Sequence, residues 1–90
     1  MTPAKHTAGP WTYGGAGGLI GGPDGIRVAD CNGLERDSEE RQANCRLIAA
    51  APELLEALRE VVQDWQDIGT VGPVTMGHVS QALSRATGGA

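Results

Sequence analysis

Two arginines carry the side chains best suited to holding an anion. Arg27 lies on the polar side of an apolar–polar alternation in residues 26–30, and Arg46 lies next to an apolar stripe in residues 43–51. A guanidinium held where a sheet meets a helix can bind a phosphate through two parallel hydrogen bonds. The alternative is that each arginine simply pairs with one of the 11 acidic residues of the chain.

Trp11 and Tyr13 are expected to form the core and cover of a sheet, although an exposed tryptophan can stack a base. The glycine-rich residues 14–25 can close over a ligand as a flap.

Catalysis and metal binding lack the residue patterns that they require. The glycine-rich stretch has no Gly-x-Gly-x-x-Gly register opening a helix and no Gly-Lys-Ser/Thr ending, as phosphate-binding loops do. The 2 histidines and 2 cysteines have no metal-binding spacing. His78 and Ser80 have no nearby acid to form a catalytic triad. We therefore expect no catalytic residue, no metal and no cofactor, and we predict that the protein is not an enzyme.

The strongest structural signal is an apolar stripe at helical spacing in the second half of the chain. It consists of Leu54, Leu55, Leu58, Val61, Val62 and Trp65. Pro52 is well placed in the first turn of this helix, so we expect a corner between helices near 36–50 and 52–67 rather than one long kinked helix. A third helix is predicted over residues 75–87, with Thr75 as its cap.

The first third of the chain predicts a small antiparallel sheet. Short extended segments at 10–13, 19–20 and 26–30 are separated by glycine-rich stretches, and Pro23-Asp24-Gly25 has the chemistry of a turn. Strands followed by helices indicate one α+β domain. We expect a flexible arm at 1–9, a sheet of two or three strands within 10–31, and a helical part at 36–87. The side chains predicted to be buried are Leu47, Leu54, Leu58, Val61 and Leu83.

Charge and apolar content exclude two classes of partner. The net charge is −4, and residues 35–67 hold nine acids against four arginines, so duplex nucleic acid would be repelled. No apolar run approaches the length of a membrane span and no signal peptide is visible, so we expect neither membrane insertion nor export. In that setting reduced thiols at Cys31 and Cys45 are favoured over a disulfide.

Self-association is expected from the width of the apolar stripe. Val62 and Trp65 extend beyond the region that one small sheet can cover. We therefore predict a homodimer or a higher symmetric oligomer that uses these helices.

Three stretches resemble a family of small proteins carried by tailed bacteriophages and prophages. Residues 6–11, His-Thr-Ala-Gly-Pro-Trp, resemble its His-Thr-Pro-Gly-Pro-Trp opening. Residues 43–58, Ala-Asn-Cys-Arg-Leu-Ile-Ala-Ala-Ala-Pro-Glu-Leu-Leu-Glu-Ala-Leu, resemble its core, and residues 82–88 resemble its usual tail. The chain departs from the family at Ala8, where proline is expected, and at Cys45, where alanine is expected.

The resemblance implies a phage accessory protein of the kind that often counteracts host antiviral defence. A sheet followed by helices is also similar to phage sponges, which sequester nucleotide immune signals without cleaving them. On this basis we expect a non-enzymatic protein in the cytoplasm of the bacterial host that sequesters a cyclic nucleotide or an ADP-ribose-type signal. Its ligand-binding residues would be Arg27, Arg46, Asn44, Trp11 and Tyr13. The alternative is an acidic interaction protein that docks on a host defence protein.

Overall fold

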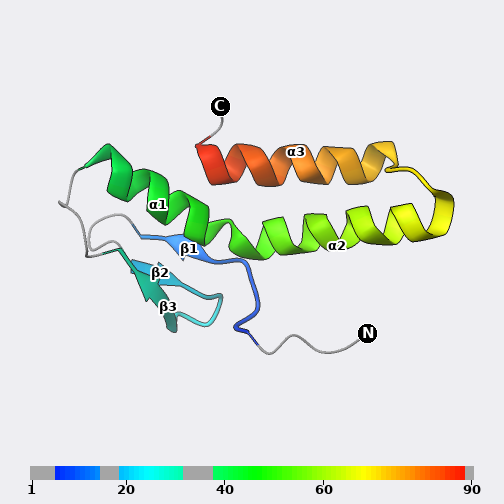
Figure 1. Cartoon of the computed structure of the whole chain (residues 1–90). Coiled ribbons are helices and arrows are strands. Elements are labelled where there is room, and N and C mark those ends of the chain that lie inside the picture. Colours follow the sequence, from blue (N-terminus) through cyan, green and yellow to red (C-terminus); the bar gives the residue numbers. More distant parts are fainter. Residues whose placement is uncertain (1–5, 15–18, 32–37, 89–90) are drawn as a thin grey trace.

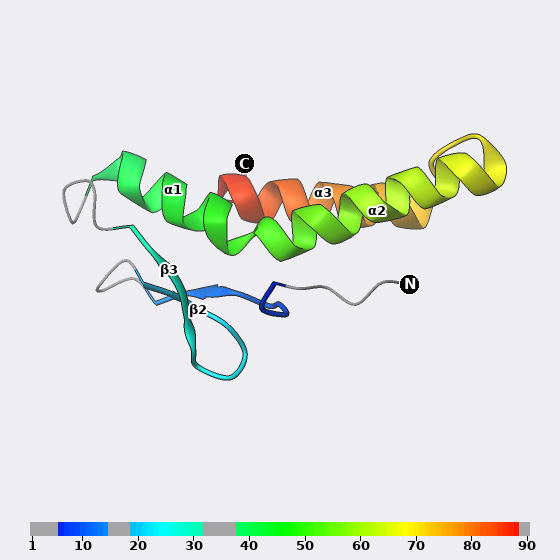
Figure 2. The ribbon, with the colours of Figure 1, turned by 60° about the horizontal axis from the view of Figure 1, so that its bottom comes forward.

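The computed structural model describes residues 6–14, 19–31 and 38–88, and its elements form two layers (Figure 1). A small N-terminal sheet lies against one side of the helices, and Figure 2 shows the same arrangement from a second direction. Residues 1–5 of the predicted arm, 15–18 of the glycine-rich stretch and 36–37 of the first predicted helix lie outside the described residues. The antiparallel sheet followed by three helices confirms the predicted α+β class.

The sheet has three strands in the order β1-β2-β3, namely Thr12–Tyr13, Leu19–Gly21 and Arg27–Asp30. Each pairs antiparallel with its neighbour. The predicted turn joins β2 to β3. In it Gly25 N donates to Gly22 O at 3.0 Å and Ile26 N donates to the Asp24 carboxylate at 3.2 Å. Gly25 has φ of 81°, a left-handed conformation in which glycine carries no steric penalty.

The helices are α1 (Glu39–Ala49), α2 (Ala51–Ile68) and α3 (Pro73–Thr87). The hydroxyl of Ser38 caps α1 by accepting from Arg41 N at 3.1 Å. The predicted corner lies at Ala50, and Pro52 stands in the first turn of α2, where its missing N–H costs no helical hydrogen bond. Helices α2 and α3 run side by side as an antiparallel hairpin (Figure 1).

The predicted cap of α3 was wrong. The helix begins at Pro73, with Gly72 at its N-cap, and Thr75 is buried inside its first turn. No side chain among the described residues caps the first turn, and the Asp64 carboxylate of α2 instead accepts a hydrogen bond from the N-cap residue, Gly72 N, at 2.9 Å. Pro73 is pre-organised for the first helical position, which is why the helix starts before the threonine.

The core of the described residues is made mostly of small side chains. Ile20 of β2 and Cys45 of α1 are the largest that are fully buried, and the other buried apolar residues are Ala49, Ala50, Ala57, Ala82 and Ala86. The sheet lies against α1, whereas α2 and α3 meet each other through Ala57 and Ala82.

Three of the predicted core positions were wrong. Leu47, Leu58 and Leu83 are 54%, 63% and 53% exposed. Leu54 and Val61 are half-buried. The reason is that alanines bring α2 and α3 close together, which leaves the large side chains at the flank of the hairpin, and the sheet does not extend over that flank. Among the described residues, no helix is both long and apolar enough to cross a membrane.

Candidate functional site

The segment of residues 6–11 that precedes β1 is called the arm from here on. A groove of about 640 Å³ lies between its residues 6–10 and the α2–α3 hairpin. Its lining residues from α2 and α3 repeat one pattern. Glu53, Glu56, Ala57 and Glu60 stand at positions i, i+3, i+4 and i+7 of α2, and His78, Gln81, Ala82 and Arg85 stand at the same four positions of α3. In an antiparallel hairpin the first position of one helix faces the last position of the other. The two helices therefore present one shared polar edge.

Arg85 joins the three parts of the chain that surround the groove. Its Nη1 lies 3.0 Å from Oε1 of Glu53 on α2, and its Nη2 donates to the backbone oxygen of Trp11 at 2.6 Å. A guanidinium with two such contacts fixes the arm relative to both helices. These contacts also bring together the three stretches on which the family resemblance rests, residues 6–11, 43–58 and 82–88.

The arm approaches α2 so closely that Gly9 has no room for a side chain. A Cβ placed on Gly9 would lie 2.8 Å from Cβ of Pro52, which is nearer than real Cβ atoms come. The arm folds back locally because the Trp11 indole N–H donates to Thr7 O at 3.0 Å, and the His6 ring lies edge-on to the Trp11 ring. Glycine at position 9 thus determines how closely the arm can pack against α2.

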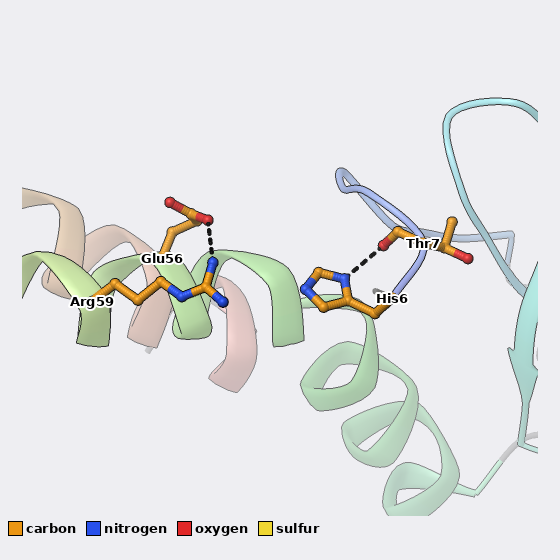
Figure 3. A network of polar contacts seen from close by, with 4 residues as sticks. All are labelled: His6, Thr7, Glu56 and Arg59. Carbon is orange, nitrogen blue, oxygen red and sulfur yellow. Dashed lines mark hydrogen bonds and ion pairs between the residues drawn. The ribbon is translucent and has the colours of Figure 1, made fainter. Parts of the chain in front are cut away.

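The wall of the groove is acidic. Oε2 of Glu60 lies 2.7 Å from Nδ1 of His78 across the hairpin, so the expectation that no acid lies near His78 was wrong. Glu56 forms a longer contact of 3.5 Å with Arg59. Figure 3 shows the Glu56–Arg59 pair together with His6, whose Nδ1 lies 2.9 Å from Thr7 O. Oε2 of Glu53 is buried and accepts no hydrogen bond from the described residues.

The floor of the groove is apolar, and this defines the ligand that fits. Pro10 of the arm, Pro52 and Ala57 of α2, and Ala82 of α3 all line it. The more exposed carboxylates of Glu56 and Glu60 can accept hydrogen bonds from an incoming N–H group. An apolar stem that ends in a cation, as in lysine or arginine, matches both the floor and the wall.

The residues predicted to bind a nucleotide do not line this groove, although Trp11 borders it. Trp11 lines a small adjoining hollow of about 70 Å³ together with His6, Ala51, Pro52 and Leu55. Arg27 is exposed on β3, and Tyr13 is half-buried on β1. Their assignment to a nucleotide stays a prediction.

The other two predicted binding residues lie on α1, away from the groove. Asn44 and Arg46 are both exposed, and two positions of separation place them about 200° apart around the helix. The Arg46 side chain passes close to the end of α3, because a Cβ on Gly88 would lie 3.3 Å from its Cδ. The structure therefore does not direct Asn44 and Arg46 toward one point.

Sequence reasoning missed the groove residues Glu53, Glu60, His78 and Arg85. A usable signal was present, since α2 has acids at i, i+3 and i+7 and α3 has basic residues at i and i+7, with alanine at i+4 of both helices. This signal can be recognised only if the two helices are known to pair antiparallel, and that pairing is a property of the tertiary structure.

A second cluster, of thiols, lies where the sheet meets α1. Cys31 follows β3 and Cys45 is buried on α1, and both are free thiols. Partial burial, together with a hydrogen bond to the Cys45 side chain, raises the pKa of Cys31 to about 11. The two histidines border the groove instead, and within residues 6–14, 19–31 and 38–88 no group of three candidate ligands is placed to hold a metal.

Comparison with known families places the chain among phage proteins. A family model described as Salmonella phage P22 protein Y8K6 matches residues 1–90. The chain belongs to this family. The match confirms the phage relationship that was predicted from residues 6–11, 43–58 and 82–88. No curated protein and no solved structure matches the chain significantly.

Proposed function

We propose that this phage protein is a non-enzymatic accessory protein that acts in the host cytoplasm by binding a defence protein of the host. The observation that carries the proposal is the acidic groove, which Glu53, Glu56 and Glu60 line together with apolar residues of the arm and both helices. The segment that it binds would present lysine or arginine. The carboxylates would receive the cation, and the proline and alanine floor would receive its methylene groups.

The net charge of the protein also favours a basic protein as the partner. The net charge of −4 attracts basic surfaces and increases the rate at which they meet the protein. We favour binding over catalysis because, in the part of the chain that the structure describes, the groove lining includes no serine, threonine, cysteine or lysine.

Capture from host cells with matched charge variants tests this proposal. Glu56→Lys with Glu60→Lys reverses the groove charge, whereas Glu40→Lys with Asp67→Lys makes the same change in net charge at exposed sites outside the groove lining. The wild type and the control pair should recover the same basic host protein, and the groove pair should lose it. Equal recovery by both double variants, with both folded by circular dichroism, would overturn the proposal.

Sequestration of a nucleotide signal is the second candidate. The observation in its favour is that neither Arg27 nor Arg46 forms a hydrogen bond or ion pair with a described residue, so both guanidinium groups are available to phosphate. Calorimetry with cyclic oligonucleotides and ADP-ribose derivatives distinguishes the two candidates. Heat that Arg27→Ala and Arg46→Ala each diminish would favour sequestration. The absence of heat for the wild type would remove it.

A further inference from the structure

One flank of the α2–α3 hairpin carries large apolar side chains that are exposed. Leu58, Val62 and Trp65 of α2 and Met76 and Leu83 of α3 form this surface, here called the apolar face, and each is between 49% and 65% exposed. We propose that the apolar face is the interface of a homodimer, in which two hairpins pack into a four-helix bundle.

The apolar face and the groove lie on opposite flanks of the hairpin. Leu58 and Val62 each follow an acid of the groove, Glu56 or Glu60, by two positions, and two positions correspond to about 200° around a helix. On α3, Leu83 follows the groove residue Gln81 by two positions in the same way. A second copy on the apolar face would leave both grooves of the dimer open.

The spacing of the apolar residues suits packing between helices. On α2 they recur at intervals of four and three, as Leu54, Leu58, Val61, Trp65 and Ile68. On α3 they recur at intervals of three and four, as Met76, Val79, Leu83 and Ala86. This is the heptad pattern that interlocks side chains of adjacent helices in bundles, and no charged residue occupies these positions.

The small apolar core indicates that the apolar face is covered by a second copy of this chain rather than by another protein. Among the described residues, Ile20 is the only large aliphatic side chain that is fully buried, and the rest of the core is cysteine and alanine. A domain of 90 residues with such a core needs further burial to remain folded. If folding requires a partner on the apolar face, that partner must be present when the chain is synthesised. Other copies of the same chain are present at that time.

The symmetry of the surface also fits a dimer. A twofold arrangement would use the apolar face on both copies at once and leave none of it exposed to solvent.

Light scattering after gel filtration is the first test, with two single variants. The wild type should have twice the 9.3 kDa mass of one chain at micromolar concentration. Leu58→Glu should give a single-chain mass or fail to fold. Ile26→Glu makes the same kind of change at a side chain that is 60% exposed next to β3, and should leave the mass at two chains.

Trp65 fluorescence provides a test that does not require a charged variant to fold. The chain has 2 tryptophans, so Trp11→Phe leaves Trp65 as the only one. Its emission should lie at short wavelength when concentrated and shift to longer wavelength as dilution separates the copies. A single-chain mass for the wild type with long-wavelength emission at every concentration would overturn the proposal, as would a larger assembly that Leu58→Glu leaves intact.

Discussion

Arg85 and Glu53 form an ion pair of 3.0 Å that crosses the helical hairpin, and the same guanidinium also donates to the backbone oxygen of Trp11. This one side chain holds the arm, the start of α2 and the end of α3 in a fixed relation. The groove depends on that relation because each of the three segments contributes to its lining.

Arg85→Met should destabilise the protein and release the arm. The partly exposed ion pair contributes about 0.2–1 kcal/mol, and the charged hydrogen bond to Trp11 O about 1.5–3 kcal/mol. Urea unfolding should therefore show a loss of roughly 2–4 kcal/mol. The matched control is Arg59→Met, whose partner Glu56 is 3.5 Å away and well exposed, and it should change stability by less than about 0.5 kcal/mol. Equal effects of the two variants would contradict the role given to Arg85.

Gly9→Ala should push the arm away from α2. The added methyl would lie 2.8 Å from Cβ of Pro52, and such overpacking typically costs about 1–3 kcal/mol. Gly77→Ala is the control, because a Cβ there meets no atom within 4 Å and alanine favours helix α3 by about 0.5–1 kcal/mol. Thermal unfolding should therefore move in opposite directions for the two variants. A Gly9→Ala protein as stable as the wild type would mean that the arm does not pack as described.

Asp64 should make the stability of the hairpin depend on acid pH. Hydrogen bonds from the Thr75 hydroxyl and Gly72 N–H hold the pKa of the Asp64 carboxyl below its usual 3.8. Because the folded state favours the ionised form, this stabilisation is present above the usual pKa and is lost as pH falls through the folded one. Asp64→Asn should be less stable than the wild type near neutral pH, and the difference should shrink in acid. A difference that stays constant from neutral pH to pH 2 would contradict this role.

Cys31 should react slowly with alkylating reagents until the solution is strongly alkaline. Its pKa of about 11 lies above the usual 9.0, because partial burial and the Cys45 side chain favour the neutral thiol. At pH 8 the thiolate fraction in the folded protein should be on the order of a hundredfold lower than in urea. Since the folded state holds this proton more tightly, its contribution to stability should decline as pH rises from 9 to 11.

Cys45→Ala provides the control for the Cys31 prediction, because it removes one of the groups that favour the neutral thiol. Alkylation of Cys31 in that variant should begin at lower pH than in the wild type. The same onset in folded wild type, Cys45→Ala and urea-unfolded protein would show that the two thiols do not interact.

Local chemistry was enough to predict the elements of this fold but not how they pack. The turn at Asp24 and Gly25 and the corner before Pro52 follow from backbone preferences that act within a few residues. The stripe containing Leu58 predicts a helix equally well whether its side chains face a sheet, a partner or solvent. Its exposure depends on Ala57 meeting the alanines of α3, which sequence periodicity does not specify.

The groove was missed for a related reason. Glu53 and Arg85 are far apart in the sequence, and each looks like an ordinary charge on the surface of a helix. Arg27 and Arg46 were selected by residue type, which says nothing about the direction in which each side chain points. The acids of α2 and the basic residues of α3 come together only because the two helices pair antiparallel.

An NMR titration of the labelled protein with a short peptide of alternating arginine and alanine tests the central claim most directly. The proposal predicts saturable shifts at the backbone amides of Gly9, Ala57 and Ala82, which line the groove. These shifts should persist in Glu40→Lys/Asp67→Lys and disappear in Glu56→Lys/Glu60→Lys, and a peptide with glutamate in place of arginine should produce none. Shifts that map to β3 or α1, or that survive reversal of the groove charge, would contradict the assignment of the groove as the binding site.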